Sequence, residues 1–130
     1  MPAQKMQSGT PLFELPIGTS GQVTATSPAE KVYLLTFEYG ADNRLTSEFC
    51  QAILFALDIL ESRHPPGVVI TTSGIGKFYS NGLDLEHANG TPGFFGDSLY
   101  ALWKRLITYP MPTVALVNGH AFAGGMMLAM

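Results

Sequence analysis

Two short apolar runs, each followed by a glycine-rich loop, constrain the fold of this chain more than any other feature. The runs are residues 68–72 and 114–117, and each comes after a segment with helical spacing. Continuous runs rich in β-branched residues suit parallel strands that are covered on both faces. The order strand, helix, strand, helix, strand predicts an α/β fold, a mixed sheet with parallel βαβ crossovers.

The two helices are predicted from the spacing of their apolar residues. The first spans residues 46–62, with Thr46 as its N-cap and Pro65 and Pro66 as its stop. The second spans residues 97–109 and ends before Pro110. Its expected apolar face consists of Leu99, Leu102, Trp103, Leu106 and Ile107. Before the first helix, three short runs, residues 12–15, 22–26 and 32–37, predict an antiparallel entry to the sheet.

Composition excludes several classes of protein. A chain of 130 residues with 46% hydrophobic content makes one domain. The formal charge of -3 and the lack of a Lys/Arg cluster disfavour nucleic acid as a partner. Cys50 is the single cysteine, so no internal disulfide is possible, and we interpret it as a small buried hydrophobe.

Neither end of the chain has the character of a membrane segment. Residues 1–17 lack the unbroken apolar core of a signal peptide, so secretion is not indicated. Residues 112–130 are almost wholly apolar, but Asn118, Gly119 and His120 interrupt them at the centre. We therefore expect a buried strand followed by a buried helix, and no membrane association.

The glycine-rich loops, residues 73–85 and 118–125, indicate where a ligand binds. Ligands of open α/β sheets lie beyond the carboxyl ends of the strands, so both loops can face the same ligand. Gly124 and Gly125 precede an apolar run and are expected to open a helix, whose unpaired NH groups favour a developing negative charge. The alternative is that these glycines serve only turns and close packing.

Common motifs with a similar appearance do not fit these loops. Gly74 and Gly76 match neither the phosphate-binding loop nor the dinucleotide fingerprint, and Phe78 stands where a serine-hydrolase elbow requires glycine. His64 and His87 have no ligand spacing with any carboxylate, so we predict no metal site.

The two loops resemble the crotonase (enoyl-CoA hydratase/isomerase) superfamily. The residues concerned are 76–85, GKFYSNGLDL, and 118–125, NGHAFAGG, and Asn43 with Leu45 fits the family's early N-x-L pattern. The resemblance implies the crotonase (ClpP-like) spiral fold. Residues 31–130 would form the N-terminal portion of such a domain, preceded by a variable N-terminal strand region at residues 1–30.

The same resemblance implies the site and its ligand. The backbone NH groups of Leu83 and Gly124 would form an oxyanion hole for a thioester carbonyl, and the substrate would be an acyl-CoA, with coenzyme A bound as part of it and no separate cofactor. The other residues expected to bind the substrate or CoA are Asn81, Gly82, Leu85 and Gly125. The family further implies a homotrimer or hexamer and an intracellular location, with the peroxisome favoured over the mitochondrion or cytoplasm.

The acid-base residues depart from the family pattern. The family's first catalytic glutamate corresponds to Met127, and its second would lie about twenty residues further on, past Met130. The resemblance therefore favours the plant and fungal delta3,delta2-enoyl-CoA isomerases, which need one base, and predicts that the chain is truncated before that base. Two alternatives stay open: a non-catalytic CoA-binding homologue, and an enoyl-CoA hydratase or other crotonase reaction.

Three residues near the loops could substitute for the missing base, but each has a more ordinary role. Asp84 is expected to accept backbone hydrogen bonds, Glu86 to be solvated, and His120 to be a half-buried ring bonded to a carbonyl. Phe94, Phe95, Tyr100 and Trp103 are expected to pack in the core rather than to hold a cofactor. Phe94 and Phe95 would lie in a mobile loop that gates the substrate.

Overall fold

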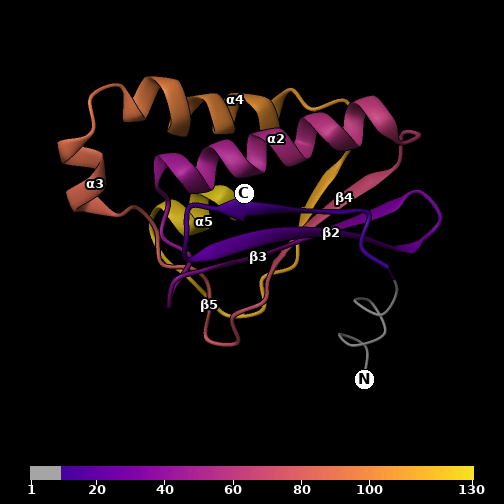
Figure 1. The fold of residues 1–130 in the computed structure, drawn as a ribbon, viewed down its shortest axis with the longest axis horizontal. Helices are drawn as coiled ribbons and strands as arrows, with labels where there is room; N and C mark the ends of the chain where they lie inside the picture. Colours follow the sequence, from indigo (N-terminus) through magenta and orange to yellow (C-terminus); the bar gives the residue numbers. More distant parts are fainter. Residues whose placement is uncertain (1–9) are drawn as a thin grey trace.

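The computed structural model describes residues 10–130, which form a mixed sheet with helices packed on one face (Figure 1). Within these residues a five-stranded sheet has the order β1-β2-β3-β4-β6. Its strands are β1 (Phe13–Ile17), β2 (Gly21–Ala29), β3 (Val32–Tyr39), β4 (Val68–Ser73) and β6 (Thr113–Ala115). The first three pair antiparallel, while β3, β4 and β6 pair parallel. This confirms the predicted α/β fold with its antiparallel entry and parallel crossovers.

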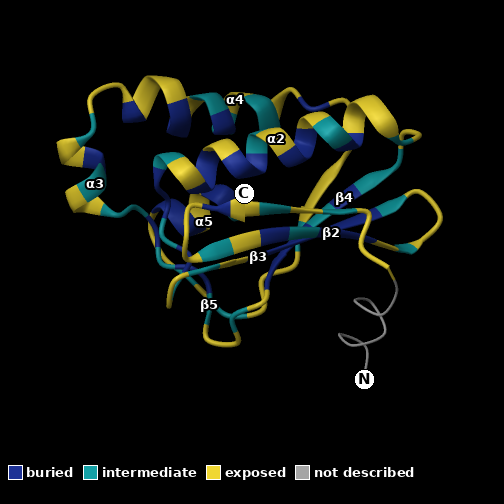
Figure 2. Ribbon diagram, viewed as in Figure 1, coloured by how far each residue is buried: buried dark blue, intermediate teal, exposed yellow. Residues whose placement is uncertain are grey.

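Helix α2 (Ser47–Arg63) makes the first crossover, from β3 to β4. Its predicted N-cap is confirmed, because the Thr46 side chain accepts a hydrogen bond from Phe49 N at 3.2 Å. Most of its apolar residues face the sheet and are buried, while its outer face is exposed (Figure 2) and includes Phe55, which is 61% exposed. No helix in residues 10–130 has the length and apolar character needed to cross a membrane.

The core lies between α2 and the sheet and is built around Phe37 of β3. The ring of Phe37 meets Phe49 and Tyr79 edge to face, each at a centroid distance of 5.2 Å. Cys50 is buried here, and burial raises the pKa of its thiol to about 12, so it acts as the small hydrophobe that was predicted. The core is thus continuous from the first crossover to the strand that leads into the glycine-rich loops.

The second crossover differs from the predicted single helix over residues 97–109. It begins earlier, as the π-helical segment η1 (Phe94–Leu99), and continues as α4 (Tyr100–Ile107). Phe94 and Phe95 therefore lie in a helical segment and not in the expected loop. Ile107, predicted on the apolar face, is 83% exposed, because no described element covers the last turn of α4.

The prediction that both apolar runs are covered on both faces is wrong for the second run. Strand β6 is shorter than predicted, and Val114, Leu116 and Val117 are between 45% and 49% exposed. The reason is its position: β6 is the last strand of the sheet and pairs only with β4 within residues 10–130.

A smaller unit at the carboxyl ends of β4 and β6 brings the two glycine-rich loops together. Strands β5 (Phe78–Ser80) and β7 (His120–Ala121) pair parallel, one in each loop. Two short helices follow them, α3 (Leu85–Gly90) after the first loop and α5 (Gly124–Ala129) after the second. The predicted opening of a helix at Gly124 is confirmed.

The cap of α2 gives a test of this local structure. We expect Thr46→Ala to lower the free energy of unfolding by about 1 kcal/mol, because the Phe49 amide loses its acceptor. Thr46→Ser keeps the oxygen and serves as the matched control. Urea denaturation measures both variants, and equal losses in the two would contradict the assignment of the cap.

Candidate active site

The two glycine-rich loops touch each other at Gly82 and Gly124. A Cβ added to Gly82 would lie 3.3 Å from Gly124 N, and one added to Gly124 would lie 3.5 Å from Leu83 N. Gly82 also has a φ of 89°, in the left-handed region, and its added Cβ would approach Phe122 O to 3.0 Å. Conformation and space together therefore favour glycine at position 82, and the loops meet backbone to backbone.

The backbone N–H of Leu83 points away from Leu45, the residue with which Leu83 forms a β-bridge. Leu45 N donates to Gly82 O at 2.9 Å, and Asp84 N donates to Leu45 O at 3.3 Å, so the residue is held on one edge. In a planar trans peptide the N–H points opposite to the C=O, so fixing Gly82 O also fixes the direction of Leu83 N–H. Within the described residues this N–H donates to no protein atom.

The amide of Gly124 is the first of helix α5 and is held in a similar way. Ala123 O, in the same peptide group, accepts a hydrogen bond from Met127 N at 3.1 Å. The N-cap Ala123 offers no side-chain oxygen, so Gly124 N–H has no partner among the described residues. Ala123 also has φ 48° and ψ -114°, a backbone conformation that costs a residue with a side chain about 1 to 3 kcal/mol.

Asn43 holds the first of these loops against the sheet. Its side chain is fully buried and satisfied: Oδ1 accepts from Tyr39 N at 2.8 Å, and Nδ2 donates to Ser73 Oγ at 2.8 Å and to Tyr79 O at 2.9 Å. Its φ of 51° is one that asparagine tolerates better than most residues. The amide thus ties the end of β3, the end of β4 and β5 together.

Ser80 and Leu45 connect Asn43 and its neighbours to the two loops that carry the free amides of Leu83 and Gly124. Ser80 Oγ donates to Asn43 O at 2.7 Å and accepts from Gly82 N at 3.2 Å. The side chain of Leu45 packs on the other loop, with Cδ1 3.1 Å from where a Cβ of Gly124 would lie. The N-x-L segment therefore contacts both halves of the candidate site.

A cavity of about 430 Å³ opens at the two free amides. Most of its lining is apolar, and the lining contains no aspartate or glutamate. Two predicted residues, Gly82 and Gly125, are buried behind it; a Cβ on Gly125 would collide with Ser80 O at 2.1 Å, so their role is close packing. The lining residues are Arg44, Asn81, Leu83, Leu85, Phe95, Leu99, Tyr100, Trp103, Ala123, Gly124 and Met127.

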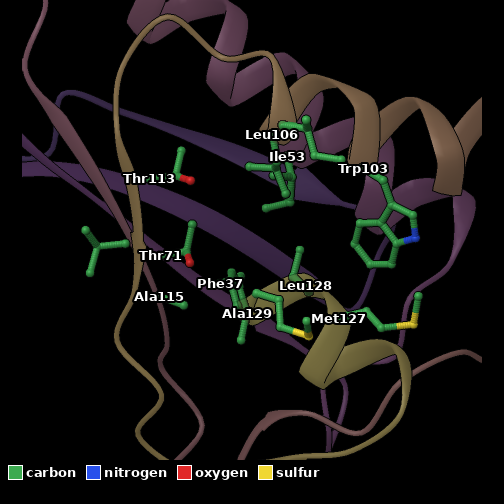
Figure 3. A pocket seen from close by; sticks show the side chains of 13 residues that line it. Phe37, Ile53, Thr71, Trp103, Leu106, Thr113, Ala115, Met127, Leu128 and Ala129 are labelled. Carbon is green, nitrogen blue, oxygen red and sulfur yellow. The ribbon is translucent and has the colours of Figure 1, made fainter.

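A second cavity of about 390 Å³ lies between α4, α5 and the open end of the sheet. Trp103 and Met127 border both cavities, and Figure 3 shows them across the second cavity from Thr113 and Ala115. Its walls are otherwise almost wholly apolar. Met127, the position at which the sequence resemblance predicts a glutamate, thus borders both spaces with an apolar side chain.

The possible substitutes for a catalytic base lie outside the first cavity. Asp84 is the N-cap of α3 and accepts from His87 N at 3.0 Å, as predicted, and Glu86 is exposed. The prediction for His120 is wrong, because its ring is exposed and stacks on Phe122 at a centroid distance of 5.4 Å. His120 contacts the first loop twice, through the hydrogen bond from His120 N to Lys77 O and through its ring, which meets Phe78 edge to face at a centroid distance of 5.7 Å.

The aromatic residues divide between the core and the cavity. Phe94 is buried, as the prediction of core packing requires. Trp103 is partly buried against the core and also lines the first cavity. Core packing is wrong for Phe95 and Tyr100, which are exposed and line the same cavity.

No group of three or more potential metal ligands occurs in residues 10–130.

His87 has a structural role that its sequence context did not reveal. Its Nε2 accepts a hydrogen bond from Ser47 N at 3.1 Å, at the first turn of α2, and its ring meets Phe94 edge to face. The imidazole therefore links α3 to the start of α2 and to η1.

Comparison with known proteins identifies the class to which this chain belongs. Residues 28–130 match the family described as enoyl-CoA hydratase/isomerase, and this chain belongs to that family. Among curated relatives, enoyl-CoA delta isomerase 3 of Arabidopsis thaliana is 33% identical over 106 residues, covering 76% of this chain and 44% of the relative. The peroxisomal enoyl-CoA delta isomerase 1 of the same plant is 35% identical, covering 78% and 44%.

Solved structures agree on the fold. The human mitochondrial delta3-delta2-enoyl-CoA isomerase superposes with a TM-score of 0.73 at 28% identity, covering 82% of this chain and 43% of that one. An enoyl-CoA hydratase from Bacillus anthracis gives a TM-score of 0.69 at 21% identity, with 82% and 43% covered. The chain thus has the crotonase fold and spans somewhat less than half the length of these relatives.

The Asn43 network predicts how strongly the site depends on one side chain. We expect Asn43→Ala to lower the free energy of unfolding by about 3 kcal/mol, because buried groups of three segments lose their partners. Asn43→Gly removes the same hydrogen bonds but tolerates the left-handed backbone, so it should lose about 1 kcal/mol less. Chemical denaturation compares the two, and a wild-type value for either variant would contradict this account.

Proposed function

We propose that this chain binds an acyl-CoA thioester with the carbonyl oxygen between Leu83 N–H and Gly124 N–H. The observation that carries the proposal is the convergence of these two partnerless amides at the first cavity. Two fixed donors stabilise the negative charge that develops on the oxygen when a proton leaves the α carbon. Each donor shares a peptide group with a carbonyl that is already hydrogen-bonded, Gly82 O for Leu83 N–H and Ala123 O for Gly124 N–H. The two N–H groups therefore need little reorganisation when charge develops on the substrate oxygen.

The reaction we propose is the conversion of a 3-enoyl-CoA into a 2-enoyl-CoA. A base removes a proton from carbon 2, the enolate oxygen is held by the two amides, and the proton returns at carbon 4. Met127 favours this reaction over hydration, because a thioether cannot serve as the second acid-base group. The names of the Arabidopsis relatives support the same reaction.

The remaining substrate contacts follow from the lining of the first cavity. Asn81, Leu83 and Leu85 form one wall, along which we place the CoA portion, with Gly82 and Gly125 supporting it from behind. The apolar residues Phe95, Leu99 and Trp103 would face the acyl chain. A homotrimeric or hexameric assembly and a peroxisomal location remain proposals, the latter supported by the peroxisomal relative.

A second candidate function is acyl-CoA binding without turnover. The observation that favours it is the cavity lining itself, which offers no carboxylate to move the proton. General acid-base catalysis typically contributes about 100- to 10,000-fold, so the described residues alone would make a weak catalyst. The assay is turnover of a 3-enoyl-CoA by the 130-residue chain, for which this candidate predicts none.

The proposed carbonyl contact is tested by removing one donor. Leu83→Pro deletes an N–H that has no partner in the protein, so we expect binding of an acyl-CoA to weaken about tenfold. Where turnover is measurable, it should fall about 100- to 1000-fold. Leu83→Ala keeps the N–H and should lose far less. Isothermal titration measures the binding.

Free coenzyme A is the internal control for this experiment, because it has no thioester carbonyl. Leu83→Pro should therefore weaken the binding of free coenzyme A less than it weakens the binding of an acyl-CoA. If Leu83→Pro bound acyl-CoA as tightly as the unsubstituted chain, the carbonyl would not lie at these amides.

A further inference from the structure

Arg44 contacts the same residue that supplies the first amide. Its Nη1 donates to Leu83 O at 3.0 Å, and its Nε donates to Asp42 Oδ2 at 3.0 Å. The side chain is 40% exposed and lines the first cavity, so part of the guanidinium faces the ligand space. Arg44 stands between Asn43, which holds the loop to the sheet, and Leu45, which holds Gly82.

The carbonyl that Arg44 holds lies on the same edge as the free amide. In an extended residue that forms a bridge, N–H and C=O point to the same side, as in a sheet ladder. Leu45 brackets Leu83 from one side through Gly82 O and Asp84 N, so Leu83 N–H and Leu83 O both point away from Leu45. By holding Leu83 O, Arg44 therefore also fixes the orientation of Leu83 N–H, the free amide on the same side of the residue.

Asp42 anchors the guanidinium and the loop together. Its Oδ2 accepts from both Arg44 Nε and Asn81 Nδ2, each at 3.0 Å, and its backbone O accepts from Asn81 N at 2.9 Å. Partial burial acts to raise the pKa of the Asp42 carboxyl, but the hydrogen bonds from Asn81 and Arg44 and the charge of Arg44 bring that pKa below its usual value. The anchor is thus ionised at neutral pH, and the pair weakens only as acid protonates this carboxyl.

Stability alone does not account for this arrangement. An ion pair that water still reaches, with side chains 40% and 25% exposed, contributes little to the free energy of unfolding, since water screens the charges. The bond from Arg44 to Leu83 O instead acts on one backbone segment at the mouth of the cavity. An arginine suits this geometry, because its planar fork can bond Asp42 and Leu83 O at once, which a lysine ammonium cannot do with the same fixed directions.

We infer that Arg44, anchored by Asp42, is a positioning residue that aims the Leu83 amide at the thioester carbonyl. This inference rests on the proposed function, because it needs an acyl-CoA carbonyl at that amide. It assigns Arg44 no contact with the reacting atoms. The arginine acts through Leu83, and its loss should weaken polarisation of the carbonyl more than it weakens binding.

The test uses a conjugated 2,4-dienoyl-CoA, whose absorption moves to longer wavelength when hydrogen bonds polarise its carbonyl. The 130-residue chain is titrated with this probe, and the dissociation constant and the spectral shift are recorded together. We expect Arg44→Met to bind the probe within about threefold of the unsubstituted chain, which is under 1 kcal/mol, but to lose more than half of the shift. Arg44→Lys should restore part of it.

Two further variants complete the design. Asp42→Asn leaves the arginine without its charged anchor and should show an intermediate shift. Arg63→Met removes an exposed arginine in the last turn of α2, remote from the cavity, and should change neither quantity. Circular dichroism verifies that each variant is folded, and Arg44→Lys keeps the test decisive if Arg44→Met does not fold.

The outcomes separate the inference from the function beneath it. A full spectral shift in Arg44→Met would overturn the positioning role and leave the proposed function intact. Weakened binding of free coenzyme A by Arg44→Met would also overturn it, because the arginine would then contact the CoA phosphates directly. An unsubstituted chain that neither binds nor shifts the probe would overturn the proposed function, and this inference with it.

Discussion

The buried amide of Asn43 is the interaction on which the candidate site depends. It joins the turn after β3 to the ends of β4 and β5. The backbone carbonyl of Asn43 accepts a hydrogen bond from the Ser80 hydroxyl, whose oxygen in turn accepts one from Gly82 N. All of these bonds except the partly buried one from Tyr39 N are buried, where an unpaired polar group costs more than in water. The position of the first glycine-rich loop is therefore set by the sheet, and the second loop follows because it packs against the first through Leu45 and Gly82.

This arrangement explains how a site can be built from backbone alone. Peptide groups whose carbonyls are already bonded present their N–H groups in fixed directions, and Leu83 and Gly124 both belong to such groups. The strained backbone of Ala123 is consistent with this, since it lets α5 start with its first amide directed at the other loop. The side chains around the cavity then determine which ligands can place a carbonyl oxygen at these two N–H groups. Proton transfer requires a group that the described lining does not supply.

Much of the fold followed from the sequence because local patterns determined it. The cap at Thr46, the spacing along α2 and the order of strands and helices predicted both crossovers, and the glycines predicted that two loops would share an edge. The features that the sequence did not predict depend on contacts between residues far apart in the chain. The exposure of Val114 and Ile107 depends on what lies beside β6 and α4, and the stacking of His120 on Phe122 depends on the loop conformation. The roles of Asp42, Arg44 and Ser80 arise from bonds to residues more than 35 positions away, which no local pattern encodes. For Asn43, only the N-x-L pattern offered a sequence indication.

The most direct test of the central claim is a crystal structure of this chain with an acyl-CoA bound. We expect the thioester oxygen to lie about 2.7 to 3.1 Å from both Leu83 N and Gly124 N. The hydrogen bond from Leu45 N to Gly82 O should be unchanged from its present 2.9 Å. A carbonyl oxygen that contacts only one of the two amides, or that lies elsewhere in the cavity, would contradict the central claim.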